Sequence, residues 1–287
     1  GAAWAAVGGG GGGDPYFASN CDGNVPTPTG ADAIAVGEFC SASGIRAVAI
    51  GRSTLANGGG SVAIGRDCES NVTDGVAIGN ASDARATNSV SIGHSNIANK
   101  QESVAIGYGC YANFYTGNGS SVAIGNAAQP RQTGTFSFAA GENVITGDCQ
   151  YNITVMRYRT PDATPQLLGT GGGTGNKPTP TDKFVTTDHT LYDVEMTVMG
   201  RSNADTSTAT AVYRFKFAAL RDIGAATLTL LTADVGKEVV YESNAAMDAD
   251  VSLNTTTGEL DVTVTGLAAT DINWVSSIRF TSQFSQI

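Results

Sequence analysis

A repeat of fourteen residues runs through the first half of the chain and limits the folds open to it. Six glycines, from Gly37 to Gly107, follow one another at intervals of fourteen residues, and each closes a short string such as Ser-Val-Ala-Ile-Gly. A seventh string ends at Gly125 after a step of eighteen, and a degenerate eighth at Gly141 after a step of sixteen. Fourteen residues provide two short strands and two turns, which is one coil of a solenoid.

Each string alternates between two kinds of side chain, as a strand with two faces does. One face carries Val or Ile, as at Val62 and Ile64, and the other carries a small residue such as Ala63. Because a single coil cannot bury Val and Ile, we expect stacked coils to bury them in a dry interior. The small residues then line the flanks, where close packing between chains would need them.

The second half of each coil is less regular but keeps a small residue five positions after the glycine. These residues are Ala42, Ala56, Ser70, Ala84, Ala98 and Ala112.

Composition agrees with stacked strands and excludes some functions. The chain contains 37 glycines, 15% charged residues and 41% hydrophobic residues, which favours tight turns and strands over helices or disorder. A net charge of −10 argues against nucleic-acid binding, since phosphates require a basic surface. No run of apolar residues is long enough for a membrane span, so we expect no membrane insertion.

The five cysteines fit neither a disulfide framework nor a zinc site. Their number is odd and no Cys-x-x-Cys pair occurs. Cys40 and Cys68 occupy the same position of coils two apart, about 9–10 Å, which exceeds the reach of a disulfide. We therefore expect unpaired thiols and assembly in a reducing compartment. The cysteines are Cys21, Cys40, Cys68, Cys110 and Cys149.

The chain divides into four regions. Residues 1–30 form a Gly-rich segment, 31–145 the repeats, 146–182 a strand with a Pro/Gly-rich linker, and 183–287 a second domain. In this last region alternation returns without the fourteen-residue period, and Asn254 to Gly258 is a turn between two strands. Six to eight antiparallel strands predict a β-sandwich or jelly roll.

Two groups of aromatic residues are candidate contacts. Tyrosines on a loop suit a receptor or glycan, and the alternative is that they cover the side of the solenoid. Those in and beside the insertion after Gly107 are Tyr108, Tyr111, Phe114 and Tyr115. Near the start, Trp4 precedes a run of glycines and could anchor the chain to another fibre or virion component; the alternative is a disordered leader.

We expect no enzyme activity, no metal and no cofactor. His94 and His189 stand alone, without the spacing of a metal site, and no Gly-x-Ser-x-Gly elbow occurs. The glycines from Gly169 to Gly175 do not meet the spacing of a phosphate-binding loop. A polysaccharide-cleaving spike needs a carboxylate pair, but the sequence places no two acids across a sugar. The acids considered on neighbouring coils are Glu69, Asp74, Asp83 and Glu102.

The Ser-Val-Ala-Ile-Gly strings resemble the head repeat of trimeric autotransporter adhesins, the YadA-like head, over residues 31–142. The resemblance implies a left-handed parallel β-roll, a homotrimer, and a surface that adheres to host molecules. Family members continue into a heptad stalk and a C-terminal membrane anchor, neither of which this sequence contains.

With its several cysteines, the chain is therefore expected to be a trimeric bacteriophage fibre or spike, assembled in the host cytoplasm, that attaches to a host receptor or glycan. The alternatives are a fragment of a bacterial cell-surface adhesin, a capsid decoration trimer and a polysaccharide-degrading spike.

Overall fold

The computed structural model describes residues 25–112, 120–130, 134–142, 149–170, 184–186, 190–203, 209–222, 228–254 and 257–284. All regular elements in these ranges are strands, which confirms the all-β prediction. The chain forms two compact units. The first contains Gly1–Phe114 and Ser120–Gln129, and the second contains Tyr115–Gly119 and Pro130–Ile287.

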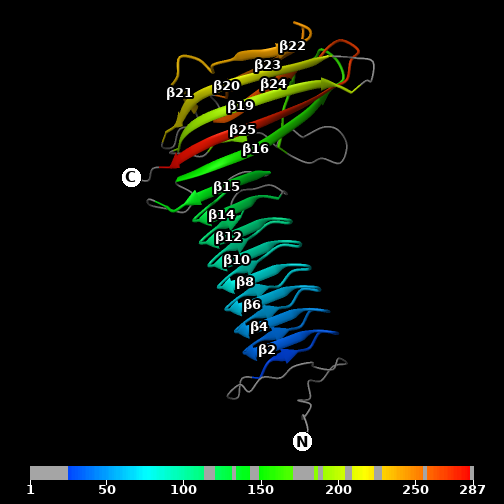
Figure 1. Ribbon diagram of the computed structural model, residues 1–287, viewed down its shortest axis with the longest axis vertical. Helices are drawn as coiled ribbons and strands as arrows, with labels where there is room; N and C mark the ends of the chain where they lie inside the picture. Colours follow the sequence, from blue (N-terminus) through cyan, green and yellow to red (C-terminus); the bar gives the residue numbers. More distant parts are fainter. Residues whose placement is uncertain are drawn as a thin grey trace, which may run out of the picture. The chain divides into compact units, whose positions relative to one another are not determined.

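The first unit is a parallel β-solenoid in which each coil supplies one long and one short strand (Figure 1). The long strands are β2 (Ile34–Glu38), β4 (Val48–Arg52), β6 (Val62–Arg66), β8 (Val76–Asn80), β10 (Val90–His94), β12 (Val104–Tyr108) and β14 (Val122–Asn126). The short strands are β1 (Thr27–Pro28), β3 (Ser41–Ala42), β5 (Leu55–Ala56), β7 (Glu69–Ser70), β9 (Asp83–Ala84), β11 (Ile97–Ala98) and β13 (Tyr111–Ala112).

Each long strand pairs in parallel with its equivalent one coil further along, in the register of the repeat. Ile64 pairs with Ile78, for example, and Gly65 with Gly79. The short strands form a second parallel sheet in the same way. The predicted parallel roll is therefore confirmed.

Each coil reverses direction through left-handed backbone positions, of which the sequence revealed only one. The repeat glycines from Gly37 to Gly125 have φ between 116° and 129°. The residue two positions later, such as Asp67 or Ala81, has φ between 51° and 61° in every coil. A third such position follows nine residues after the glycine, as at Asp74 and Asn88. Gly60, Asp74 and Asn88 are of the residue types that tolerate positive φ best, whereas Arg46 and Glu102 adopt the same conformation without that preference.

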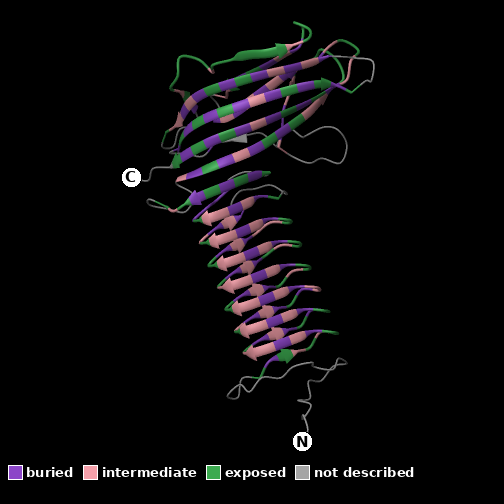
Figure 2. Cartoon of the chain, viewed as in Figure 1, coloured by how far each residue is buried: buried purple, intermediate pink, exposed green. Residues whose placement is uncertain are grey.

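Small side chains fill the interior of the solenoid. Ala63 and Ala77 of the long strands and Ala56 and Ala84 of the short strands are fully buried. Val62 and the other Val and Ile side chains of the repeats lie on the outside, half-buried, so the long strands of Figure 2 alternate between buried and intermediate residues.

The prediction that Val and Ile fill the interior, with the small residues outside, was therefore wrong. Alternation separates two faces without showing which of them turns inward. A coil of fourteen residues encloses a narrow space, which alanine, serine, threonine and cysteine side chains fill together with Asn96.

The second unit contains two antiparallel sheets. The larger has the strand order β15 (Thr135–Ala140), β16 (Cys149–Thr160), β25 (Ile272–Phe284), β19 (Thr190–Ser202) and β20 (Thr210–Arg221). The remaining edge of β20 pairs with β21 (Leu228–Leu230) and β22 (Glu238–Glu242). In the smaller sheet β24 (Glu259–Thr265) pairs with β17 (Gln166–Leu167), β18 (Phe184–Val185) and β23 (Asp248–Leu253).

A common apolar core joins the two sheets into the predicted sandwich. Tyr213, Phe215 and Phe217 of β20 are buried in one cluster with Val262 of β24 and Trp274 of β25. The indole nitrogen of Trp274 donates a hydrogen bond of 2.9 Å to Thr160 Oγ1. The predicted hairpin around residues 254–258 is present as β23 and β24, where Leu253 pairs with Leu260.

Two segments pair in ways that the local pattern did not reveal. The eighth repeat string forms β15, whose neighbour β16 runs antiparallel to it, and both belong to the second unit. Strand β16, predicted only as a strand beside a linker, pairs along its whole length with β25. Partners separated by more than a hundred residues leave no trace in a local alternation, because either strand could pair with any other of matching faces.

Candidate functional site

One outer surface of the solenoid is apolar along all seven coils, and we call it the Val/Ile face. Each of its side chains is half-buried, because it stacks in register on its equivalents in the neighbouring coils. The Val/Ile face consists of Ile34, Val36, Val48, Ile50, Val62, Ile64, Val76, Ile78, Val90, Ile92, Val104, Ile106, Val122 and Ile124.

Nothing charged interrupts this surface along the solenoid, since charged residues begin only where the strands end, at positions such as Arg52 and Arg66. Contiguous apolar surfaces that remain accessible on a folded domain commonly contact another molecule. The Val/Ile face is therefore the first candidate functional surface of this chain.

The residue three positions after a repeat glycine is buried in every coil, and in four coils its side chain bonds to the carbonyl oxygen of the next repeat glycine. Ser82 Oγ donates to the carbonyl oxygen of Gly93 at 3.0 Å, and Asn96 Nδ2 donates to that of Gly107 at 2.8 Å. The thiols of Cys40 and Cys110 occupy the same place, 3.1 Å and 3.2 Å from the carbonyl oxygens of Gly51 and Gly125. These cysteines thus hold buried carbonyl groups between coils, which is a structural role.

Cys40, Cys68 and Cys110 are buried and form no disulfide, as the two-coil separation predicted. Loss of hydration on burial raises the pKa of the Cys68 and Cys110 thiols above its ordinary value of 9.0. The folded state therefore favours the protonated thiols more strongly than the unfolded chain does.

This difference predicts a loss of stability in alkali. Since the native pKa values are raised, the unfolded chain releases these protons first, and the free energy of unfolding falls as pH rises above about 9. Hydrogen exchange of the coil amides between pH 8 and pH 10, corrected for its intrinsic pH dependence, measures the effect. The double variant Cys68→Ser, Cys110→Ser should reduce the fall, because serine, as at Ser82, makes the same bond without titrating. An equal fall in both proteins would contradict the assignment.

The structure separates the predicted aromatic residues. Tyr108 ends β12, is 57% exposed, and stacks on His94 of the previous coil with ring centroids 4.9 Å apart and planes 7° apart. Tyr111 lies on the short strand β13, half-buried, and pairs with Ile97 of β11. Both residues belong to the regular coil rather than to the insertion after it. Their role in binding stays a prediction.

Three predicted contact residues lie outside the described residues: Trp4, Phe114 and Tyr115. Their docking and binding roles stay predictions as well.

The four acids considered for sugar cleavage form two separate groups. Glu69 and Asp83 are neighbours in register on β7 and β9, and each is already bonded, to Asn71 and Arg85 respectively. Asp74 and Glu102 occupy equivalent turn positions two coils apart. Over the described ranges no group of three or more His, Cys, Asp and Glu side chains could hold a metal ion, and no helix is fit to cross a membrane.

The repeats match a known family. Residues 42–67, 73–96 and 84–109 match the model of the YadA head domain repeat. No curated protein sequence matches the chain.

Similar solved structures are tailspikes of Acinetobacter phages. The tailspike protein gp49 of Acinetobacter baumannii bacteriophage Fri1, a capsular polysaccharide depolymerase, is 9% identical, with 83% of this chain and 41% of that chain covered and a TM-score of 0.27. The tailspike of Acinetobacter baumannii phage AM24 is 8% identical, with 91% of this chain and 48% of that chain covered and a TM-score of 0.27. The tailspike of Acinetobacter phage vB_ApiP_P1 is 9% identical, with 88% of this chain and 51% of that chain covered and a TM-score of 0.21.

The chain spans about half the length of these tailspikes or less. Scores this low do not establish a common fold. The match to the repeat model, the fourteen-residue period and the stacked parallel coils agree with one another. Over residues 42–109 the solenoid of this chain therefore matches the YadA head domain repeat in both sequence and coil structure.

Proposed function

We propose that this chain is the subunit of a homotrimeric adhesive fibre or spike, in which the Val/Ile faces of three copies meet. The observation that carries the proposal is the Val/Ile face itself, which stays in contact with water in a single chain. Burying such side chains contributes about 25 cal/mol for each Å² removed from water. Seven coils of the same two residue types therefore supply a large driving force for association.

A second copy fits this surface best. The Val/Ile face repeats with the period of the coil, so an identical solenoid presents ridges at the same spacing. A cyclic arrangement brings equivalent surfaces of identical chains around one axis. The number three follows from the resemblance to trimeric adhesin heads.

The adhesive role is assigned to the surfaces that such packing leaves outside. The outward residues of the short strands vary from coil to coil, from Leu55 through Glu69 and Asp83 to Tyr111, whereas the Val/Ile face does not vary. Together with Tyr108, this variable side suits recognition of a host receptor or glycan. We assign the protein to a bacteriophage virion, with Trp4 as its contact to other fibre components.

The native mass tests the assembly. Mass photometry of the purified chain should report three times 29.2 kDa, and dilution should not release monomers down to nanomolar concentration. A monomer would overturn the trimer.

The location needs a separate test. Antibodies against the chain should label phage particles. Labelling of bacterial cells alone would select the surface adhesin instead.

The absence of enzyme activity stays a prediction. Incubation with the capsular polysaccharide of the host, followed by an assay for reducing ends, tests it. A steady release of reducing ends would make the chain a polysaccharide-degrading spike. Loss of that activity in Glu69→Gln or Asp83→Asn would then place the reaction on the short-strand sheet.

A further inference from the structure

Three arginines stand close together on the solvent face of the large sheet of the second unit. Arg159 of β16 and Arg201 of β19 both pair with Asn273 of β25, which lies between them. Arg157 precedes Arg159 by two residues on β16, so its side chain points to the same face. The residues between them on each strand point into the sandwich instead.

An apolar row borders these arginines. Arg157 pairs with Val275 of β25, which pairs in turn with Met199 of β19, and the two apolar side chains are 39% and 47% exposed. Neighbouring strands lie about 4.8 Å apart and alternate residues of a strand about 7 Å apart, so the two rows cover about 10 Å by 7 Å. We call these residues the arginine patch: Arg157, Arg159, Met199, Arg201, Asn273 and Val275.

The arginine patch has an unbalanced positive charge. The guanidinium group of Arg159 pairs with the carboxylate of Asp271. Arg157 and Arg201 are exposed, and no acid among the residues that the structure describes pairs with either of them. Three guanidinium groups beside one carboxylate repel one another, so an added anion is favourable at this place.

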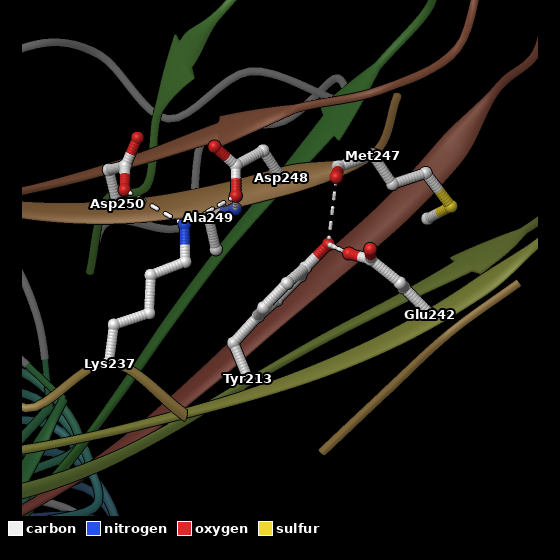
Figure 3. A network of polar contacts seen from close by, with 7 residues as sticks. All are labelled: Tyr213, Lys237, Glu242, Met247, Asp248, Ala249 and Asp250. Atoms are coloured by element: carbon white, nitrogen blue, oxygen red, sulfur yellow. Dashed lines mark hydrogen bonds and ion pairs between the residues drawn. The ribbon is translucent and has the colours of Figure 1, made fainter. Parts of the chain in front are cut away.

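Basic side chains elsewhere on the sandwich have acidic partners. Arg279 of β25, for example, lies 3.8 Å from Glu195 of β19. On the smaller sheet, Figure 3 shows Lys237 between Asp248 and Asp250, at 2.6 Å and 3.0 Å. The arginine patch therefore differs from the rest of this surface in the positive charge that it leaves unpaired.

We propose that the arginine patch binds one carboxylate-bearing sugar residue of a host-surface glycan, an inference that rests on the adhesive role proposed above. The planar guanidinium groups of Arg157 and Arg201 match a carboxylate through paired hydrogen bonds. Val275 and Met199 would lie against the sugar ring, and the amide oxygen of Asn273 can accept a hydrogen bond from a hydroxyl group. Three copies of a weak site in one trimer would act together.

A long polyanion fits this surface less well. Acidic peptide segments and nucleic acids carry charges at short intervals and require a continuous row of basic groups. The other basic side chains of this face are already paired, Arg214 with Glu238 and both Lys216 and Arg279 with Glu195. The charge available to a ligand is therefore confined to one compact patch, which favours a single acidic unit.

Binding of matched sugars to the full chain tests the proposal. The probes are a fluorescently labelled tetragalacturonate and its methyl ester, which differ in the charge of the carboxyl groups. Fluorescence anisotropy at low salt should show at least about tenfold tighter binding of the acidic form, a preference that about 0.5 M salt should largely remove. The same comparison of sialyllactose with lactose covers an acidic sugar of another shape. No preference for the acidic member of either pair would overturn the proposal.

Charge removal at two positions locates the site. Arg157→Gln with Arg201→Gln should weaken binding of the preferred acidic sugar at least about tenfold, because both unpaired guanidinium groups are lost. Arg214→Gln with Lys216→Gln is the matched control, since it removes the same charge from exposed positions of the same face, and the affinity should stay within about twofold. Circular dichroism checks that both variants fold. An equal loss of affinity in the two would show general charge attraction and overturn the site.

Tetraglutamate with the same label tests the other class of ligand. An affinity equal to that of the preferred acidic sugar would make an acidic peptide the ligand and overturn the glycan. Should Arg157→Gln with Arg201→Gln fail to fold, the comparison of acidic and neutral sugars on the unmodified chain still decides. The native mass separates this site from the assembly. A trimer without the preference overturns the site alone, whereas a monomer that shows the preference keeps the site and overturns the trimer.

Discussion

Gly79→Ala is expected to destabilise the solenoid by about 4 kcal/mol or more, which is exceptional for the addition of one methyl group. Gly79 has φ of +124°, a conformation that side chains rarely adopt. An added Cβ would lie 1.9 Å from the carbonyl oxygen of Gly93 in the next coil. Neither the backbone strain nor the clash can relax locally, because the coil on each side is held in register by the same parallel sheet. The strain can be relieved only if the neighbouring coils of the solenoid separate.

Hydrogen exchange followed by mass spectrometry measures this loss coil by coil in the full chain. Gly59→Ala is the matched control, because Gly59 is also a solenoid glycine but its added Cβ would approach nothing nearer than the Ile45 carbonyl oxygen at 4.0 Å. The control should change stability by less than about 1 kcal/mol. Equal protection of the coil amides in the two variants would contradict the close stacking of the repeat glycines.

The double variant Ile64→Glu, Ile92→Glu is expected to convert the proposed trimer into monomers. Both side chains belong to the Val/Ile face, and a trimer would enclose six added carboxylates with no basic partner on that face. An unpaired buried charge costs several kcal/mol, so association should weaken at least about thousandfold. Mass photometry should then report 29.2 kDa.

The opposite outer surface supplies the control. Leu55 and Ile97 are also half-buried on the outside of the solenoid, but on the short strands β5 and β11. Leu55→Glu, Ile97→Glu adds the same charges and should leave the trimer intact. If the control dissociates and the Val/Ile variant does not, the trimer forms through the short-strand surface and the assignment made here is wrong.

Local regularity in the sequence was enough for several features. The fourteen-residue period predicted parallel coils in register, because identical strings stack best on one another, and it predicted the unpaired state of Cys40 and Cys68. Alternation also predicted the buried faces of β19 and β20, where Met196 and Phe215 lie in the core. The sequence identified Tyr108 and Tyr111 as candidate contact residues, but it did not predict that they lie on strands β12 and β13.

Only the tertiary structure decided which side of each repeat faces inward. A strand with Ile64 on one face and Ala63 on the other satisfies the alternation in either orientation, and the narrow space inside a fourteen-residue coil selects alanine. Long-range pairing decided the rest. β16 joins β25, and β22 is left as an edge, because pairing partners are chosen by the whole sandwich and not by the neighbours of a residue in the chain.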